Sequence, residues 1–213
     1  MPKVLRPLQY DKNVFINCPF DDPYKPLFHA VVFTVYDMGF RPKCAKDMSN
    51  AGQPRFNKIQ GLIENCKYSV HDISRTELDR VTRLPRFSMP LELGLDLGCR
   101  RYGKPHHQEK VILVLDTEQY RYQTFISDIA GQDIEEHGGE EENAITVVRN
   151  WLRPELDPKL VKTPSGPRIY GRYQAFQATL PSICVKLNWD MNNLPFVDFS
   201  WAVSDWISNN PIK

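Results

Sequence analysis

Short apolar runs alternate with segments of helical periodicity through the first 152 residues of the chain. Each apolar run has the length of a buried strand, and each intervening segment repeats its apolar residues at the spacing of a helix. We predict strands at 14–18, 40–45, 68–73, 111–115 and 132–136, and helices at 25–38, 55–66, 90–101 and 143–152. Strands that alternate with helices indicate a parallel sheet covered by helices on both faces. We therefore expect an α/β fold, a flavodoxin-like doubly wound parallel sheet of about five strands.

The chain after residue 152 has a different character. Residues 153–168 are rich in proline and glycine and are expected to form a linker or a wrapping arm. Segments 170–187 and 194–209 have helical patterns and many aromatic residues. Exposed aromatic side chains on this scale promote association, so we expect this segment to pack on the core or on another subunit. The sequence thus predicts an α/β domain at 1–152 and a C-terminal helical extension at 153–213.

Composition excludes several classes of protein. The net charge is +1 among 213 residues, which gives no support for direct nucleic-acid binding through phosphates. The five cysteines are scattered, as expected for free thiols in a reducing compartment. No apolar run reaches membrane-spanning length and no apolar signal segment is present at the start, so a cytoplasmic protein without membrane contact is expected.

Two carboxylates occupy positions that matter for chemistry. Asp72 ends a predicted strand, and Glu92 lies near the start of a helix that has Pro90 near its first position. In an open α/β sheet both would face the crevice at the carboxyl ends of the strands, and two converging carboxylates are suited to breaking a bond at an anomeric carbon. The helix dipole would favour an ionised Glu92 by about 0.3–1 kcal/mol. The alternatives are an ordinary helix-start glutamate and a turn or N-cap aspartate.

Other candidate residues surround the same crevice. Asn17, Pro19, Phe20 and Asp21 belong to the connection that follows the first strand and reaches this edge of the sheet. Asp21 or Asp22 is alternatively the cap of the helix that starts near Pro23, and for Asp22 we expect the cap.

The loop between Asp72 and Glu92 offers further candidates. It contributes Ser74, Met89 and four arginines, Arg75, Arg80, Arg83 and Arg86, whose guanidinium groups match phosphate geometry. A solvated loop is the alternative for any one arginine.

Several other patterns are interpreted structurally. His71 precedes Asp72, so strand alternation predicts a packed histidine that points away from the face of Asp72. His106 and His107 lack partners at ligand spacing, so no metal site is expected. Gly94 and Gly98 are expected to allow close packing of their helix on the sheet. The glycine-rich motifs of dinucleotide-binding and P-loop proteins are absent, which disfavours both classes.

Three segments resemble a known superfamily. They are Val14 to Asp22 (VFINCPFDD), residues 59–74 with their strand ending in Asp72, and Met89 to Gly94 (MPLELG). In order and spacing they are similar to the first strand and loop, the third strand, and the nucleophile segment of the bacterial TIR-like and nucleoside 2-deoxyribosyltransferase-like superfamily. The resemblance spans roughly residues 12–152, and Gly103-Lys-Pro105 also fits it. Two family signatures are absent: Pro85 to Ser88 stand in place of Asp-Ser-Gly-Thr, and no Trp-Cys pair precedes the glutamate.

The resemblance implies an N-glycosidase or N-ribosyl transferase. Glu92 would attack C1′ of a ribose or stabilise an oxocarbenium-like centre, and Asp72 would hold the sugar. NAD+, a nucleoside or a nucleotide would be the substrate, without a metal or other cofactor. The resemblance further implies a homo-oligomer or a partner protein bound through the extension, and a role in bacterial anti-phage defence. The alternative is a non-catalytic module that senses a nucleotide and recruits a partner.

Overall fold

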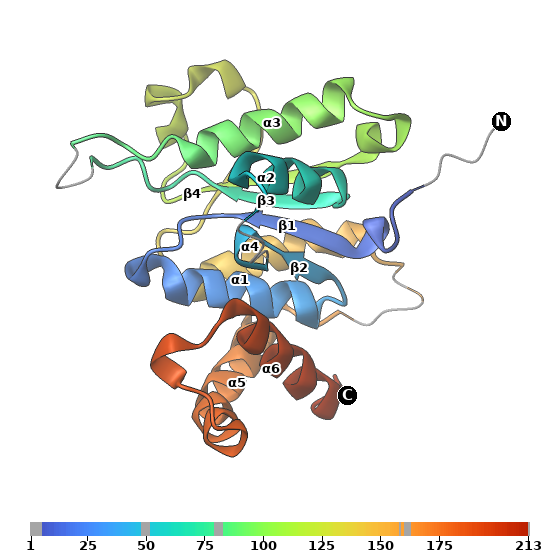
Figure 1. Cartoon of the computed structure of the whole chain (residues 1–213), viewed down its shortest axis with the longest axis vertical. Helices are drawn as coiled ribbons and strands as arrows, with labels where there is room; N and C mark the ends of the chain where they lie inside the picture. The colour runs from blue at the N-terminus through green and yellow to red at the C-terminus, as the bar shows by residue number, and fades with distance from the viewer. Residues whose placement is uncertain (1–5, 48–51, 79–82, 158, 160–162, 213) are drawn as a thin grey trace.

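The computed structural model describes residues 6–47, 52–78, 83–157, 159 and 163–212. Its centre is a five-stranded, all-parallel sheet with the order β2-β1-β3-β4-β5 (Figure 1). The strands are β1 (Asn13–Asn17), β2 (Arg41–Lys43), β3 (Tyr68–Asp72), β4 (Val111–Asp116) and β5 (Ile134–Glu136). This order confirms the predicted flavodoxin-like fold, and it places the ends of β1 and β3 side by side, with Asn17 aligned to His71.

Helices cover both faces of the sheet. On one face lie α1 (Lys25–Asp37) and α4 (Glu141–Leu152), and on the other lie α2 (Arg55–Glu64) and α3 (Ser88–Tyr102). The central strands β1 and β3 are buried along their whole length, which explains their continuous apolar runs. Alternation along the strands sends Ile16 and Val70 toward α1, and Phe15 toward α2.

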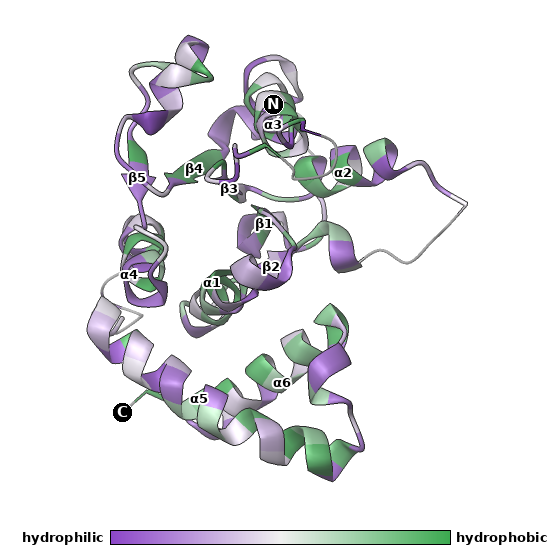
Figure 2. Ribbon diagram, turned by 90° about the vertical axis from the view of Figure 1, so that its left-hand side faces the viewer, coloured by the Kyte–Doolittle hydropathy of each residue, from purple (hydrophilic) through white to green (hydrophobic). Residues whose placement is uncertain are grey.

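The C-terminal extension forms a third layer. Helices α5 (Gly166–Leu187) and α6 (Phe196–Asn209) pack on α1, and α5 also contacts α4. Figure 2 shows α1 enclosed between the sheet and the α5–α6 pair, and its ribbon is largely hydrophobic. Phe33 of α1 contacts the rings of Tyr173, Phe176 and Trp206 at centroid distances of 5.5, 5.6 and 5.8 Å. The extension therefore shares one core with the α/β domain.

Helix α5 begins inside the segment predicted as a linker. Pro167 lies in its first turn, where a missing backbone N–H costs nothing. Gly166 is needed because a Cβ there would lie 2.2 Å from Oγ1 of Thr146 on α4. The proline and the glycine thus start a helix and let it approach α4 closely.

The prediction that Gly94 and Gly98 allow close packing of their helix on the sheet was wrong. A Cβ added to either glycine would meet no atom within 4 Å, so neither residue packs closely on the sheet. Both instead line the open side of α3 that faces α2.

No helix in the described part of the chain is both long enough and apolar enough to span a membrane.

The first prediction tests the third layer. Phe176 is fully buried against Phe33 and Phe199, so Phe176→Ala should lower the free energy of unfolding by about 3–5 kcal/mol. Val185→Ala, on the same helix at a side chain that is 79% exposed, should change it by less than about 0.5 kcal/mol. Urea unfolding followed by circular dichroism measures both. Equal midpoints for the two variants would contradict a shared core.

Candidate functional site

Glu92 lies in the second turn of α3. The helix begins at Ser88 and has no acidic residue in its first turn, so the predicted first-turn position is wrong. The side chain is only 7% exposed, and none of the described residues hydrogen-bonds to its carboxylate. Burial raises the pKa of Glu92 to about 7, although the charge of Arg55 opposes the shift. At neutral pH this carboxylate is therefore divided between its acid and base forms, instead of being fully ionised as the helix-start argument predicted.

The start of α3 is fixed to the end of β1. The Nδ2 group of Asn17 donates a hydrogen bond to the carbonyl of Met89 at 3.0 Å, and it lies 3.0 Å from Nδ1 of His71. Asn17 and Met89 were predicted to bind substrate, but here they are buried and bond to each other. Their role in the structure is to hold the turn of α3 that carries Glu92.

His71 continues this contact into a buried ionic group. Its Nε2 lies 2.9 Å from Asp96 of α3, and the ammonium of Lys110 lies 3.1 Å from the other oxygen of Asp96. Burial alone raises the pKa of Asp96, but His71 and Lys110 outweigh it and the net pKa is lowered. His71 is a packed residue pointing away from the side of Asp72, as the alternation of the strand predicted.

Asp72 is completely buried and surrounded by protein partners. The hydroxyl of Tyr24 donates a short hydrogen bond to Oδ2, and the backbone N–H of Ser74 donates to Oδ1 at 2.9 Å. Burial and the charge of Asp72 raise the pKa of Tyr24, so its hydroxyl keeps the proton that it donates. The carboxylate of Asp72 is fully buried in this structure, and its contact with a sugar stays a prediction.

His137 is the third partner of Asp72. Its Nδ1 accepts a hydrogen bond from the N–H of Gly139 at 2.9 Å, which assigns the ring proton to Nε2. That nitrogen lies 3.0 Å from Oδ2 of Asp72, in ion-pair range but without hydrogen-bond geometry. Tyr24 and His137 lie 113 positions apart in the numbering of the chain, so no motif spacing could have linked them to Asp72.

The two carboxylates reach the sheet edge from opposite faces. Asp72 points toward the α1 side, where Tyr24 lies, whereas Glu92 belongs to α3 on the other side. Both charges act on the buried thiol of Cys18, and burial together with these charges raises its pKa. The two carboxylates thus lie around the end of β1, one on each side of the sheet.

A second aspartate, Asp116, lies at the same edge of the sheet as Asp72. Asp116 ends β4, and Arg121 binds its carboxylate while donating to the carbonyl of Ser74 at 2.7 Å and to Thr76 at 2.6 Å. Burial raises the pKa of Asp116 despite the charge of Arg121. Sequence reasoning missed this pair, although an aspartate ending the apolar run of β4 was the same signal that marked Asp72.

Asp21 joins the first connection to the arginine loop. Its carboxylate accepts from the N–H of Tyr24 at 3.0 Å and lies 3.5 Å from Arg75 and 3.3 Å from Arg86. Asp21, and not Asp22, is therefore the cap of the short helix η2 (Asp22–Tyr24). Both arginines are partly exposed, so their guanidinium groups remain available to an anion. Arg83 is exposed, and Arg80 lies outside the described residues.

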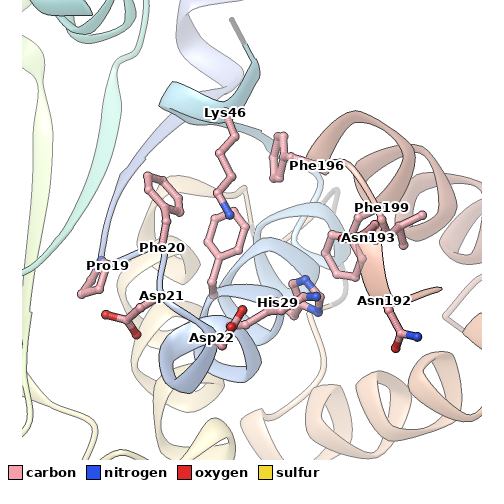
Figure 3. Close-up of a pocket in the computed structure, with 13 residues that line it drawn as sticks. Pro19, Phe20, Asp21, Asp22, His29, Lys46, Asn192, Asn193, Phe196 and Phe199 are labelled. Atoms are coloured by element: carbon pink, nitrogen blue, oxygen red, sulfur yellow. The ribbon is translucent and has the colours of Figure 1, made fainter. Parts of the chain in front are cut away.

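The predicted site residues fall into two places. Glu92, Asn17, Met89, Asp72 and Ser74 surround the ends of β1 and β3. Pro19, Phe20 and Asp21 instead line a pocket between the start of α1 and the C-terminal extension, shown in Figure 3. Asp21 connects the two places because it also pairs with Arg75 and Arg86.

Within the described ranges, no three His, Cys, Asp or Glu side chains are grouped as metal ligands. Comparison with known protein families, with characterised proteins and with solved structures finds no significant match to this chain. The chemical interpretation of the site therefore depends on its own residues.

The second prediction concerns Asp72. Hydrogen bonds to a buried carboxylate contribute about 1.5–3 kcal/mol, so Asp72→Asn should lower the free energy of unfolding by roughly 2 kcal/mol. Asp205→Asn, at an exposed position of α6, should leave it within about 0.5 kcal/mol of the parent. Chemical denaturation of both variants provides the comparison, and an unchanged stability for Asp72→Asn would show that its buried partners contribute nothing.

The third prediction concerns the pH dependence of stability. A raised folded pKa for Glu92 means that the ionised form destabilises the fold, so the parent loses stability as pH rises from 4.5 through about 7. Glu92→Gln removes this loss, and its stability relative to the parent should increase by roughly 1–2 kcal/mol between pH 4.5 and about pH 8. The full shift would give about 3 kcal/mol, which residual solvent contact reduces. Unfolding curves at several pH values measure the difference, with exposed Glu142→Gln as control. A difference that does not change with pH would exclude the raised pKa.

Proposed function

We propose that this protein cleaves or transfers an N-ribosyl group, breaking the bond between base and ribose in NAD+ or in a nucleoside or nucleotide. The observation that carries this proposal is Glu92, a buried carboxylate that has no hydrogen-bond partner among the described residues and a pKa of about 7. A strongly perturbed carboxylate at the carboxyl edge of a parallel sheet is characteristic of a functional group.

The burial of Glu92 suits a reaction that develops positive charge. In a site of low polarity, a carboxylate interacts strongly with an oxocarbenium-like centre at C1′. Glu92 in its ionised form would attack C1′ or stabilise that centre while the base leaves, and water or an acceptor would then complete hydrolysis or transfer. A cationic leaving group such as nicotinamide needs no strong general acid, and its charge would also favour ionisation of Glu92. NAD+ is therefore the first substrate to test.

The surrounding residues supply supporting roles. Asn17 would fix α3, and Asp72 with Tyr24 and His137 would hold the end of β3 as positioning residues, because neither Asn17 nor Asp72 is open to substrate. Arg75 and Arg86 are partly exposed and lie 3.5 and 3.3 Å from Asp21, so a substrate phosphate could replace that partner.

The wider setting is part of the same proposal. A cytoplasmic location would supply NAD+ and nucleotides, and the resemblance to TIR-like proteins suggests bacterial anti-phage defence. A second copy or a partner protein would bind the extension, where Val197 and Trp201 of α6 are half exposed.

A non-catalytic nucleotide-sensing module is the second candidate. It is favoured by the protein hydrogen bonds of Asp72 and Asn17, which leave neither side chain free to contact a substrate beside Glu92. In that case a nucleotide would bind and leave unchanged.

The fourth prediction separates these candidates. Incubation with NAD+ and with nucleosides, followed by mass spectrometry, should show released base for the parent and a loss of at least about 100-fold for Glu92→Gln. Because the ionised form is the active one, the parent rate should increase as pH rises through about 7. The exposed Glu142→Gln variant should retain full activity.

Retained turnover in correctly folded Glu92→Gln would exclude Glu92 as the catalytic group. A bound but intact nucleotide with both proteins would instead support the sensing module.

A further inference from the structure

A continuous chain of buried polar groups lies between the sheet and the helices α2 and α3, which share one face of the sheet (Figure 1). Counted from the end of α2, its members are Lys110, Asp96, His71, Asn17 and the carbonyl of Met89. Each of these residues is 8% exposed or less. The chain ends three residues before Glu92, the group on which the proposed reaction depends.

The carbonyl of Met89 fixes the direction of the hydrogen bonds along this chain. A carbonyl only accepts, so the side-chain atom of Asn17 that lies 3.0 Å from it is the amide nitrogen. The same NH2 group lies 3.0 Å from Nδ1 of His71, which must therefore accept its second hydrogen. Nε2 of His71 then carries the ring proton and donates to Asp96 at 2.9 Å. A ring protonated on both nitrogens would set two donors against each other and break the chain at Asn17.

The other end of the chain is attached to α2. The ammonium of Lys110 lies 3.1 Å from Oδ1 of Asp96. It also donates to the carbonyls of Ile63, at 2.8 Å, and Cys66, which lie at the end of α2 where carbonyls have no intrahelical partner. The ring of Phe15 meets that of His71 at close to a right angle, with centroids 5.8 Å apart. The chain is thus held at α2, and its far end is the first turn of α3.

Apolar contacts already attach α3 to the sheet, so the polar chain has a different effect. Leu93 of α3 packs with Ile73 and Val114, and such contacts have no preferred direction. Hydrogen bonds in a buried chain are directional and fix one arrangement of the groups that they join. Met89 and Glu92 are both buried and lie on the same side of the helix, because residues three apart are neighbours there. The bond from Asn17 therefore fixes the part of α3 that carries the Glu92 carboxylate.

We propose that His71 and Asp96 are positioning residues for Glu92, a role that rests on the proposed reaction. Neutral His71, with its proton on Nε2, keeps the Asn17 amide in the orientation that bonds to Met89, and Asp96 keeps the ring in that form. Both residues are fully buried, so they act through Asn17 and not on the substrate. Loss of the chain frees the first turn of α3 and admits water to Glu92.

Titration of the Glu92 carboxyl group tests this role without a substrate. Carbon-13 NMR, with the signal assigned by its absence in Glu92→Gln, should give a pKa of about 7 in the parent. His71→Phe keeps a ring and removes both hydrogen bonds, so the midpoint should move to lower pH by at least about one pH unit. His71→Gln offers one acceptor and one donor, as the neutral ring does, and should restore the parent midpoint. The other groups that act on or face Glu92, Arg55 of α2 and the thiol of Cys18, are unchanged in these variants.

Two further variants complete the set. Val70→Ala is the matched control, because Val70 precedes His71 in β3 and is buried on the opposite face. It should lower the stability and leave the Glu92 midpoint unchanged. Asn17→Leu has nearly the same shape without a donor, and it should shift the midpoint as His71→Phe does. It also decides the question if His71→Phe does not fold.

The parent protein and its activity provide independent measurements. Nitrogen-15 NMR of the parent at neutral pH should show the proton of His71 on Nε2 alone. In the base-release assay, His71→Phe should lower kcat by about 10- to 100-fold with KM nearly unchanged, and His71→Gln should recover most of this loss. The pH profile of the rate in His71→Phe should move to lower pH with the Glu92 midpoint.

Two results would overturn the positioning role. They are a proton on Nδ1 of His71 in the parent, and a Glu92 midpoint that is the same in the parent and in the folded variants that break the chain. If the midpoints shift as expected but the parent releases no base, the anchoring of Glu92 stands and only the proposed reaction is excluded.

Discussion

Helix α1 is buried on almost all of its sides, and the rest of the structure depends on this. Nine of its thirteen residues are buried, including two consecutive valines and Phe33, so one sheet face cannot cover it. A helix that is apolar all round needs partners on every side. The sheet, α4 and the α5–α6 pair supply them, and the extension is therefore required by the composition of α1.

Much of the fold could be predicted because strands buried on both faces leave continuous apolar runs. The same runs could not reveal the exact start of α3. The sequence predicted Pro90 near the first position of this helix, but the helix begins at Ser88 and Pro90 is its third residue. A proline is tolerated there because the first four N–H groups of a helix have no intrahelical partner. That shift of two residues moves Glu92 out of the first turn and away from the helix dipole.

The arrangement of the site was less accessible to sequence reasoning. Asp72 was recognised at a strand end, and Asn17 and Asp21 in the connection after the first strand. Their partners come from distant segments, such as Met89 for Asn17 and His137 for Asp72. Local sequence patterns indicate whether a polar residue lies at the end of a strand. Whether its hydrogen-bonding groups are occupied by protein partners depends on tertiary contacts. The burial of Glu92, and hence its raised pKa, also depends on tertiary contacts and could not be predicted from local patterns.

Charge balance among the buried carboxylates distinguishes Glu92 from its neighbours. Asp37 is bound by Arg172, Asp96 by Lys110 and Asp116 by Arg121, and Asp72 is held by Tyr24 and His137. Among the buried carboxylates, Glu92 alone has no hydrogen-bond or ion-pair partner within the residues that the structure describes. An unpaired buried carboxylate lowers the stability of the fold in its charged form, and replacement by glutamine would remove that cost. A destabilising carboxylate at the carboxyl edge of the sheet is the observation from which we proposed a functional role for Glu92.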